Sequence, residues 1–279
     1  MKGAQVADVG EEVRRAGRAT LRLGVVSYLN AAPLAHGLDA ERSFSLERAL
    51  PSRIAERLHA EEIDGGTIPS IEYARGSFEV VPGVAIASRG PVRSVMLFLR
   101  RRLEDVRSVG LDTSSRTSAA LTRVLLRARL GRDPEYVPMA PDVHAMLERC
   151  DAGLVIGDPA LYYEGGSARL DLGEAWRELT GLPFVWAFWA GRPGAVSAGE
   201  VRRLQRALAD GLAALPEIAR AWSGGSPQRE ALSVSYLRDN MAYALGEAEQ
   251  RAALREFYAR AHALGLIPRI PEIRFYGDR

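Results

Sequence analysis

Residues 108–130, SVGLDTSSRTSAALTRVLLRARL, contain the unit that decides the fold. The first five residues, 108–112, form a short, branched, apolar run that is typical of a buried strand. After a polar loop the pattern becomes that of an amphipathic helix, with Leu121, Val124 and Leu125 on one face. A strand that leads through a loop into a helix is the building unit of α/β proteins.

The same alternation extends outward in both directions. Further strands are predicted at residues 21–27, 44–50, 63–68, 80–88, 92–101, 135–139, 152–158 and 182–191. Helices are predicted between them, and a run of helices follows residue 197. The alternation predicts an α/β protein with two lobes, each a mostly parallel sheet flanked by helices, and with two crossovers between the lobes. Lobe 1 is expected to comprise residues 21–101 and 192–279, and lobe 2 residues 102–191.

The composition of the chain excludes some classes of partner. Of the 279 residues 47% are hydrophobic, which is enough for one large core or two modest ones. The net charge is only +2 and the basic residues are scattered, so no nucleic-acid partner is expected. No apolar stretch is long enough to span a bilayer, so no membrane partner is expected either. Residues 1–20 lack the apolar core of a signal peptide and are expected to be a disordered or extra segment of a cytoplasmic protein.

Two scarce residue types exclude some chemistry. Cys150 is the single cysteine, which excludes an intramolecular disulfide and a cysteine-rich zinc site. Lys2 is the single lysine and lies at the very start, so Schiff-base catalysis has no suitable residue. The four histidines have no metal-binding spacing, and no metal is expected.

In open α/β sheets, ligands bind beyond the carboxyl ends of the strands. In the first lobe Ser27, Tyr28 and Asn30 follow the first strand, and Ser70 and Ser88 follow later ones. Asn30 and Ser70 have a simpler interpretation as helix caps, which is compatible with ligand contact. The pair Gly65-Gly66 within a strand suggests a close approach of another chain segment.

The clearest site signal is in the second lobe. Ser115, Arg116, Thr117 and Ser118 stand where a helix begins, and the helix dipole favours anions there. A carboxylate fits this place, and the guanidinium of Arg116 is expected to clamp it. An ordinary helix cap is an equally good interpretation of the serines. Asp158, at the tip of another strand, is either a cap or a proton carrier. The residues together predict a cleft that binds a small anion, without naming a reaction.

Six blocks of sequence resemble a known family. They are VSYLNAAPL (26–34), IPSIEY (68–73), IASRGPVRSV (86–95), LDTSSRTSAAL (111–121), LVIGDPAL (154–161) and DLGEAWRELTGLPFVWAFWA (171–190). In this order they resemble the chorismate dehydratases of the futalosine pathway to menaquinone, over roughly residues 21–270. The resemblance implies a type-II periplasmic-binding-protein fold. It also implies a reaction without cofactor, in which chorismate loses water to give 3-[(1-carboxyvinyl)oxy]benzoate.

The resemblance also implies roles for the candidate residues. Ser115, Arg116, Thr117 and Ser118 would hold one carboxylate of chorismate, and the remaining candidates would hold its other groups: Ser27, Tyr28, Asn30, Ser70, Ser88 and Gly157. Asn30 or Asp158 would assist proton removal or departure of hydroxide. Because an amide is a poor base, a carboxylate of the substrate itself is the rival for proton removal.

Two other functions stay open at this stage. The first is a solute-binding protein of the same fold, since fold does not decide function. Such proteins usually carry a signal peptide or a lipidated cysteine near the start, and neither is seen here. The second is the sister enzyme of the same pathway, which forms the dihydroxynaphthoate product. The sequence leaves the oligomeric state open.

Overall fold

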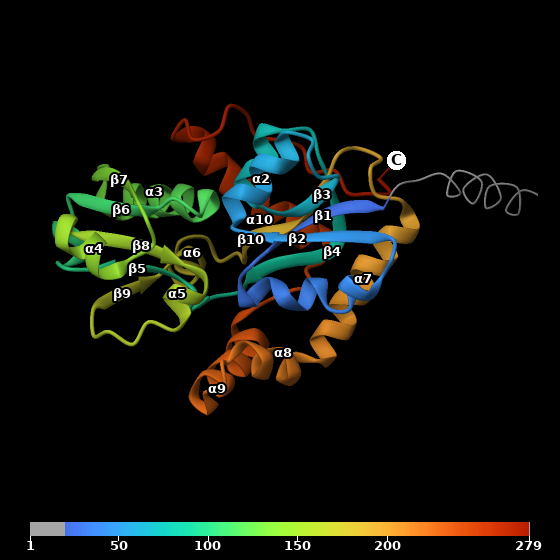
Figure 1. Ribbon diagram of the computed structural model, residues 1–279. Coiled ribbons are helices and arrows are strands. Elements are labelled where there is room, and N and C mark those ends of the chain that lie inside the picture. Colours follow the sequence, from blue (N-terminus) through green and yellow to red (C-terminus); the bar gives the residue numbers. More distant parts are fainter. Residues whose placement is uncertain (1–19, 279) are drawn as a thin grey trace, which may run out of the picture.

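The computed structural model describes residues 20–278 and shows two lobes, each built on one sheet (Figure 1). The segment predicted over residues 1–20 lies, except for Thr20, outside the described residues. The α/β class and the two lobes are confirmed.

The first sheet has five strands in the order β2-β1-β3-β10-β4. β1 pairs in parallel with β2 and β3, whereas β10 is antiparallel to β3 and β4. The bounds are β1 Leu21–Val26, β2 Phe44–Ala49, β3 Gly65–Pro69, β4 Glu79–Ser88 and β10 Phe184–Gly191.

The second sheet repeats this plan, with the order β7-β6-β8-β5-β9. β6 pairs in parallel with β7 and β8, whereas β5 is antiparallel to β8 and β9. The bounds are β5 Val95–Leu99, β6 Ser108–Asp112, β7 Glu135–Met139, β8 Ala152–Ile156 and β9 Ala168–Asp171.

The sheets are therefore mixed, and the antiparallel strands are the ones that arrive from the other lobe. β5 follows directly from β4 of the first sheet, and β10 returns from the second lobe. The chain thus crosses between the sheets at residues 89–94 and again at 181–183. The predicted division at residues 101 and 192 assigns β5 and β10 to the lobes they come from. An apolar run predicts a strand but not its hydrogen-bonding partner. The observed pairing places β5 in the second lobe and β10 in the first.

Helices cover both sheets. Those between the strands are α2 Pro51–His59, α3 Arg116–Leu130, α4 Val143–Arg149, α5 Gly157–Leu161 and α6 Leu172–Thr180, with the 3₁₀ segments η1 Leu29–Ala35, η2 Leu38–Ala40, η3 Ser70–Arg75 and η4 Leu103–Asp105. The chain ends with α7 Ala198–Ala213, α8 Leu215–Trp222, α9 Pro227–Ser235, the π-helical turn η5 Tyr236–Asn240 and α10 Glu247–Ala263. α7 and α8 pack against η1 of the first lobe. In the described part of the chain, no helix is both long and apolar enough to cross a membrane.

Glycines in the strands let helices approach the sheets closely. A Cβ atom at Gly66 would lie 2.7 Å from Ile54 Cγ2 of α2, so it is a side chain that comes close to the strand there. In the second lobe, a Cβ atom at Gly153 would lie 2.7 Å from Met146 Cβ of α4. Ile54 and Met146 are both fully buried, so each glycine makes room for a large core side chain.

Asp151 gathers the arginines that follow β5. Its carboxylate accepts hydrogen bonds from Arg100 Nη2 at 3.0 Å, Arg101 Nε at 2.8 Å and the Arg107 backbone N–H at 3.0 Å. Burial by itself would raise the pKa of this carboxyl, but these hydrogen bonds outweigh it and hold the pKa at about 2. Arg100 and Arg101 are thus part of an ion-pair network at the end of the second sheet.

We expect Asp151→Asn to lower the free energy of unfolding by about 2 kcal/mol near neutral pH, because hydrogen bonds to a charged acceptor are lost. The folded-state pKa lies below the ordinary 3.8, so the carboxylate stabilises the fold above that pH. This stabilisation disappears as the pH falls toward about 2. Urea titrations between neutral and acid pH measure both effects.

Asp133→Asn is the matched control, since its carboxylate is 44% exposed and pairs with Arg127 on the surface. Its effect should stay within about 0.5 kcal/mol. Equal effects of the two substitutions would contradict the special role of Asp151.

Candidate active site

A narrow pocket lies between the two sheets, where strand ends from both lobes meet. Its lining residues come from both lobes and from the first crossing: Val26, Tyr28, Asn30, Pro51, Pro69, Ile86, Val92, Ser94, Val95, Ser115, Thr117, Ser118, Ile156, Gly157, Trp186 and Ala187. The space in which the centre of a water molecule fits inside this pocket is about 50 Å³. In this structure the two lobes meet around the pocket, and a ligand the size of a substituted ring needs them to part before it enters.

The start of α3 forms the polar wall of the second lobe. Ser115 is the N-cap, and its Oγ accepts a hydrogen bond from the Ser118 backbone N–H at 3.3 Å. Ser115, Thr117 and Ser118 also line the pocket, so the cap and the ligand-binding interpretations hold for the same residues. The positive end of the α3 dipole is therefore directed at the pocket, as a carboxylate requires.

A buried carboxylate fixes the loop before α3. Asp112 Oδ1 accepts hydrogen bonds from the Ser114 backbone N–H at 2.8 Å and from Ser114 Oγ at 2.6 Å, and Oδ2 accepts one from the Ile156 N–H at 3.2 Å. Burial raises the pKa of Asp112, and the bonds from Ser114 oppose this. Asp112 does not line the pocket, so its role is to tie the loop before α3 to the end of β8.

Tyr28 of the first lobe packs on Gly157 of the second. A Cβ atom at Gly157 would lie 2.7 Å from the Tyr28 ring, and Gly157 has φ +68°, so glycine is required twice over. The Tyr28 hydroxyl lies 3.3 Å from Ser114 Oγ. Burial raises the pKa of this hydroxyl, which stays neutral at physiological pH. Tyr28 and Gly157 both line the pocket, where they also bring the lobes together.

Asn30 presents an unsatisfied polar atom at the pocket. It lies in η1, and its Oδ1 is buried without a hydrogen-bond partner among residues 20–278. The side chain is close to the Tyr236 hydroxyl, which shares a 2.7 Å hydrogen bond with Ser94 Oγ. Burial raises the pKa of Tyr236 far above physiological pH. A buried amide oxygen without a partner marks a place where a ligand donor is missing.

Ser94 and Trp186 also line the pocket. Ser94 lies in the first crossing between the sheets, and Trp186 is on β10, which returns from the second lobe. Residues in a crossing between two lobes must pass the cleft, so a predicted crossover indicates residues that can line it. The sequence does not give the strand pairing, however, and the predicted division at residues 101 and 192 lies several residues after the observed crossings.

Three predicted serines lie just outside the pocket lining. Ser88 Oγ accepts a 3.1 Å hydrogen bond from Trp186 Nε1, so it orients a lining residue. Ser70 is fully buried and its Oγ donates to the Val185 carbonyl at 2.7 Å. Ser27 is half-buried, and its backbone N–H donates to the Ala49 carbonyl at 3.0 Å. Their direct contact with a ligand stays a prediction.

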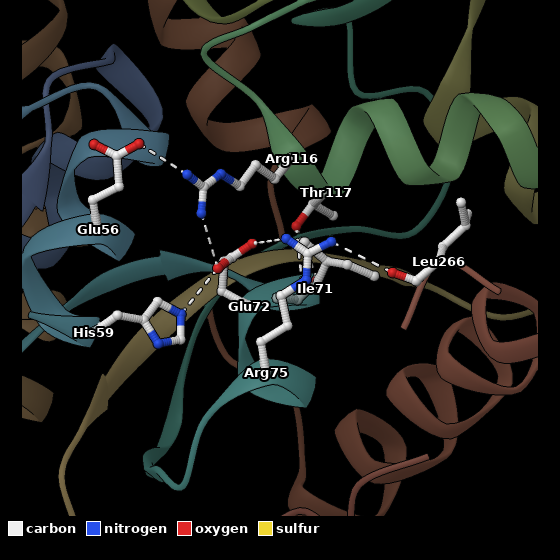
Figure 2. A network of polar contacts seen from close by, with 9 residues as sticks. Glu56, His59, Ile71, Glu72, Arg75, Arg116, Thr117 and Leu266 are labelled. Atoms are coloured by element: carbon white, nitrogen blue, oxygen red, sulfur yellow. Dashed lines mark hydrogen bonds and ion pairs between the residues drawn. The ribbon is translucent and has the colours of Figure 1, made fainter. Parts of the chain in front are cut away.

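Arg116 is directed toward Glu56 and Glu72 (Figure 2) and is not among the residues that line the pocket. Its Nη1 lies 3.1 Å from Glu72 Oε2, and its Nη2 lies 2.9 Å from Glu56 Oε1. Both carboxylates belong to the first lobe, so the guanidinium that was expected to clamp a ligand bridges the lobes instead.

Asp158 also bridges the lobes in this structure. Its Oδ1 accepts a 3.0 Å hydrogen bond from the Leu29 backbone N–H, and its Oδ2 accepts a 2.7 Å bond from Trp222 Nε1. Burial raises the pKa of this carboxyl, and the two hydrogen bonds oppose the rise. A raised pKa suits a proton carrier, but Asp158 does not line the pocket.

The chemistry of the pocket wall is neutral throughout. None of the lining residues found within 20–278 carries a side chain that is ionised at neutral pH; hydroxyl groups, one amide and apolar side chains make up the wall. Over the same described range, no group of three or more His, Cys, Asp or Glu side chains is placed to hold a metal ion. The pocket is suited to a partly apolar ring that carries hydrogen-bond acceptors.

Comparison with known proteins gives consistent relatives. A family model described as "Menaquinone biosynthesis" matches residues 21–263. The chorismate dehydratase of Thermus thermophilus is 32% identical over 265 residues, which cover 88% of this chain and 95% of that protein. The chorismate dehydratase of Campylobacter jejuni is 32% identical over 162 residues, which cover 57% and 58%.

Solved structures share the fold at lower identity. A protein from Archaeoglobus fulgidus superposes with a TM-score of 0.69 at 21% identity, covering 88% of this chain and 98% of its own. The periplasmic aliphatic sulphonate binding protein SsuA of Escherichia coli superposes with a TM-score of 0.65 at 18% identity, covering 92% and 96%. These likenesses confirm the periplasmic-binding-protein fold alone. Since the family model covers most of the described chain, the protein belongs to the menaquinone biosynthesis family.

Proposed function

We propose that this protein is a chorismate dehydratase, a hydro-lyase that converts chorismate to 3-[(1-carboxyvinyl)oxy]benzoate. The observation that carries the proposal is the pocket itself, where the hydroxyl-rich start of α3 faces Asn30 across the two lobes. Two relatives that bear the name chorismate dehydratase support it. A cytoplasmic site of action belongs to the same proposal, and cell fractionation tests it.

The reaction asks little of the protein beyond positioning. Chorismate loses its ring hydroxyl and the hydrogen on the carbon that bears the enol ether, and the ring becomes aromatic. The elimination is redox-neutral, so no electron acceptor is needed. Aromatisation supplies the driving force, and the protein has to orient the substrate, exclude water and manage the protons.

The pocket offers a place for each part of the substrate. Ser115, Thr117 and Ser118 hold one carboxylate at the positive end of α3. Asn30 lies on the opposite wall and acts on the departing hydroxyl, since an amide donates and accepts hydrogen bonds but is a poor base. The proton acceptor is either Asp158 or the second carboxylate of chorismate.

Incubation with chorismate tests the proposal directly. The purified protein should produce an aromatic product, detectable by absorbance and mass spectrometry, whereas a solute-binding protein would give only a complex. Asn30→Ala should lower kcat about a hundredfold or more, because a polar group at the reacting centre is lost. Gln228→Ala is the control, since it removes the same amide from an exposed site outside the pocket. Full activity of Asn30→Ala would remove Asn30 from the mechanism.

Gly157→Ala tests whether the substrate is bound in this closed pocket. The added methyl group would collide with the Tyr28 ring, and the affinity for chorismate should fall about tenfold or more. Gly131→Ala is matched, because Gly131 has φ +67° but no neighbour within 4 Å of the added atom. Both substitutions carry the same backbone strain of about 1 kcal/mol. Titration calorimetry should show weaker binding for Gly157→Ala alone; equal binding of both variants would place the substrate elsewhere.

Asp158→Asn decides between the two proton acceptors. If Asp158 carries the proton, kcat should fall about a hundredfold or more with little change in binding. In the wild type, kcat should then decline as the pH falls through the raised pKa of this carboxyl, because a base must be ionised. Trp222→Phe is the control, since it removes one hydrogen bond to Asp158 and leaves the charge. Unchanged turnover of Asp158→Asn assigns proton removal to the substrate.

A further inference from the structure

Glu72 is a buried acid with partners from both lobes (Figure 2). Its side chain is 1% exposed. Oε1 accepts a 2.9 Å bond from Arg75 Nη1, and Oε2 accepts bonds from His59 Nε2 at 3.0 Å and Arg116 Nη1 at 3.1 Å. A carboxylate with so little access to water needs such partners in place of the solvent.

The partners of Glu72 differ in the lobe they belong to. His59 is on α2 and Arg75 on η3, and both elements belong to the first lobe, like Glu72 itself. They stay with the carboxylate when the lobes part. Arg116 is the first residue of α3 in the second lobe, so its bond to Glu72 exists only when the lobes are closed. In the first lobe, His59 and Arg75 therefore hold Glu72 in place, and Arg116 is its one partner from the second lobe.

A second bond crosses the cleft at the same point. Thr117 Oγ1 accepts a 3.1 Å hydrogen bond from the Ile71 backbone N–H, next to Glu72 in sequence. Thr117 also lines the pocket, as does Ser115 on the other side of Arg116. The Arg116–Glu72 pair thus fixes the place of those hydroxyl groups relative to the first lobe.

We infer that Arg116 and Glu72 are a positioning pair that brings the start of α3 to the first lobe and so completes the pocket, and that Arg116 is not a ligand of the substrate. The kinetic part of this inference rests on the proposed function. Because Glu72 and Glu56 occupy both terminal nitrogens of Arg116, the carboxylate of the substrate is left to the hydroxyl groups and backbone of α3.

The inference makes a kinetic prediction. When the pair is lost, substrate binding has to supply the free energy of closure. The apparent affinity then falls, but saturating substrate still closes the lobes. Arg116→Met should raise KM for chorismate about tenfold or more and leave kcat within about threefold.

The Glu72→Gln variant separates positioning from binding. It should raise KM as Arg116→Met does, and the double variant should be no worse than either single one, since both remove one interaction. If Arg116 bound substrate, release from Glu72 would leave KM unchanged or lower it, and this result overturns the inference. Glu56→Gln should have little effect, because that carboxylate is 47% exposed.

Arg129→Met is the matched control for Arg116→Met. Arg129 lies on the same helix and pairs with Glu178 of α6 at 2.5 Å, within the second lobe. It should leave KM unchanged. Thermal unfolding of every variant shows whether the fold is kept, and if Glu72→Gln does not fold, hydrogen exchange in the ligand-free Arg116→Met and Arg129→Met variants decides.

Hydrogen exchange tests closure without any substrate. The Ile71 N–H is buried and bonded across the cleft, so its exchange reports opening of the lobes. In the ligand-free protein, Arg116→Met should speed exchange in residues 70–75 about tenfold, and Arg129→Met should not. Unchanged exchange in Arg116→Met overturns the inference. Should wild-type protein leave chorismate unconverted, the proposed function fails, while this measurement still decides the role of the pair.

Discussion

The site depends on one constraint of chain topology, which is that each sheet is completed by an antiparallel strand coming from the other lobe. β5 inserts between β8 and β9, and β10 inserts between β3 and β4. Two direct crossings keep the strand ends of both sheets at the same gap, so that loops far apart in sequence face each other there. Ser94 is placed at the pocket by one crossing, and Trp186 by the strand that follows the other.

Polar contacts join the lobes across that gap. Arg116 meets Glu72, Thr117 meets Ile71, and Asp158 meets Leu29 and Trp222. Hydrogen bonds and partly exposed ion pairs exchange for water at a modest net cost, whereas separated apolar surfaces would lose much more. Apolar side chains of both lobes also belong to one continuous core, so parting the lobes would expose part of that surface as well.

Much of the fold could be predicted from local sequence, and less of the site. The alternation of strand and helix and the helix start at Ser115 depend on neighbouring residues, so the sequence is sufficient for them. The direction of Arg116 depends on Glu72, which lies 44 positions away and meets it only in three dimensions. The same holds for Asp158, whose partners Leu29 and Trp222 belong to the other lobe. Local patterns are therefore least informative about the partners of charged side chains.

The neutral wall of the pocket bears on how the proposed elimination removes its proton. The second carboxylate of a bound chorismate, the one not held at the start of α3, would lose part of its hydration without gaining a full positive charge nearby. Desolvation makes it a stronger base, whereas a guanidinium in contact would make it a weaker one. By holding Arg116 away from the pocket lining, Glu72 would preserve the basicity of that second carboxylate. The same ion pair that completes the pocket would thereby favour the substrate as its own base.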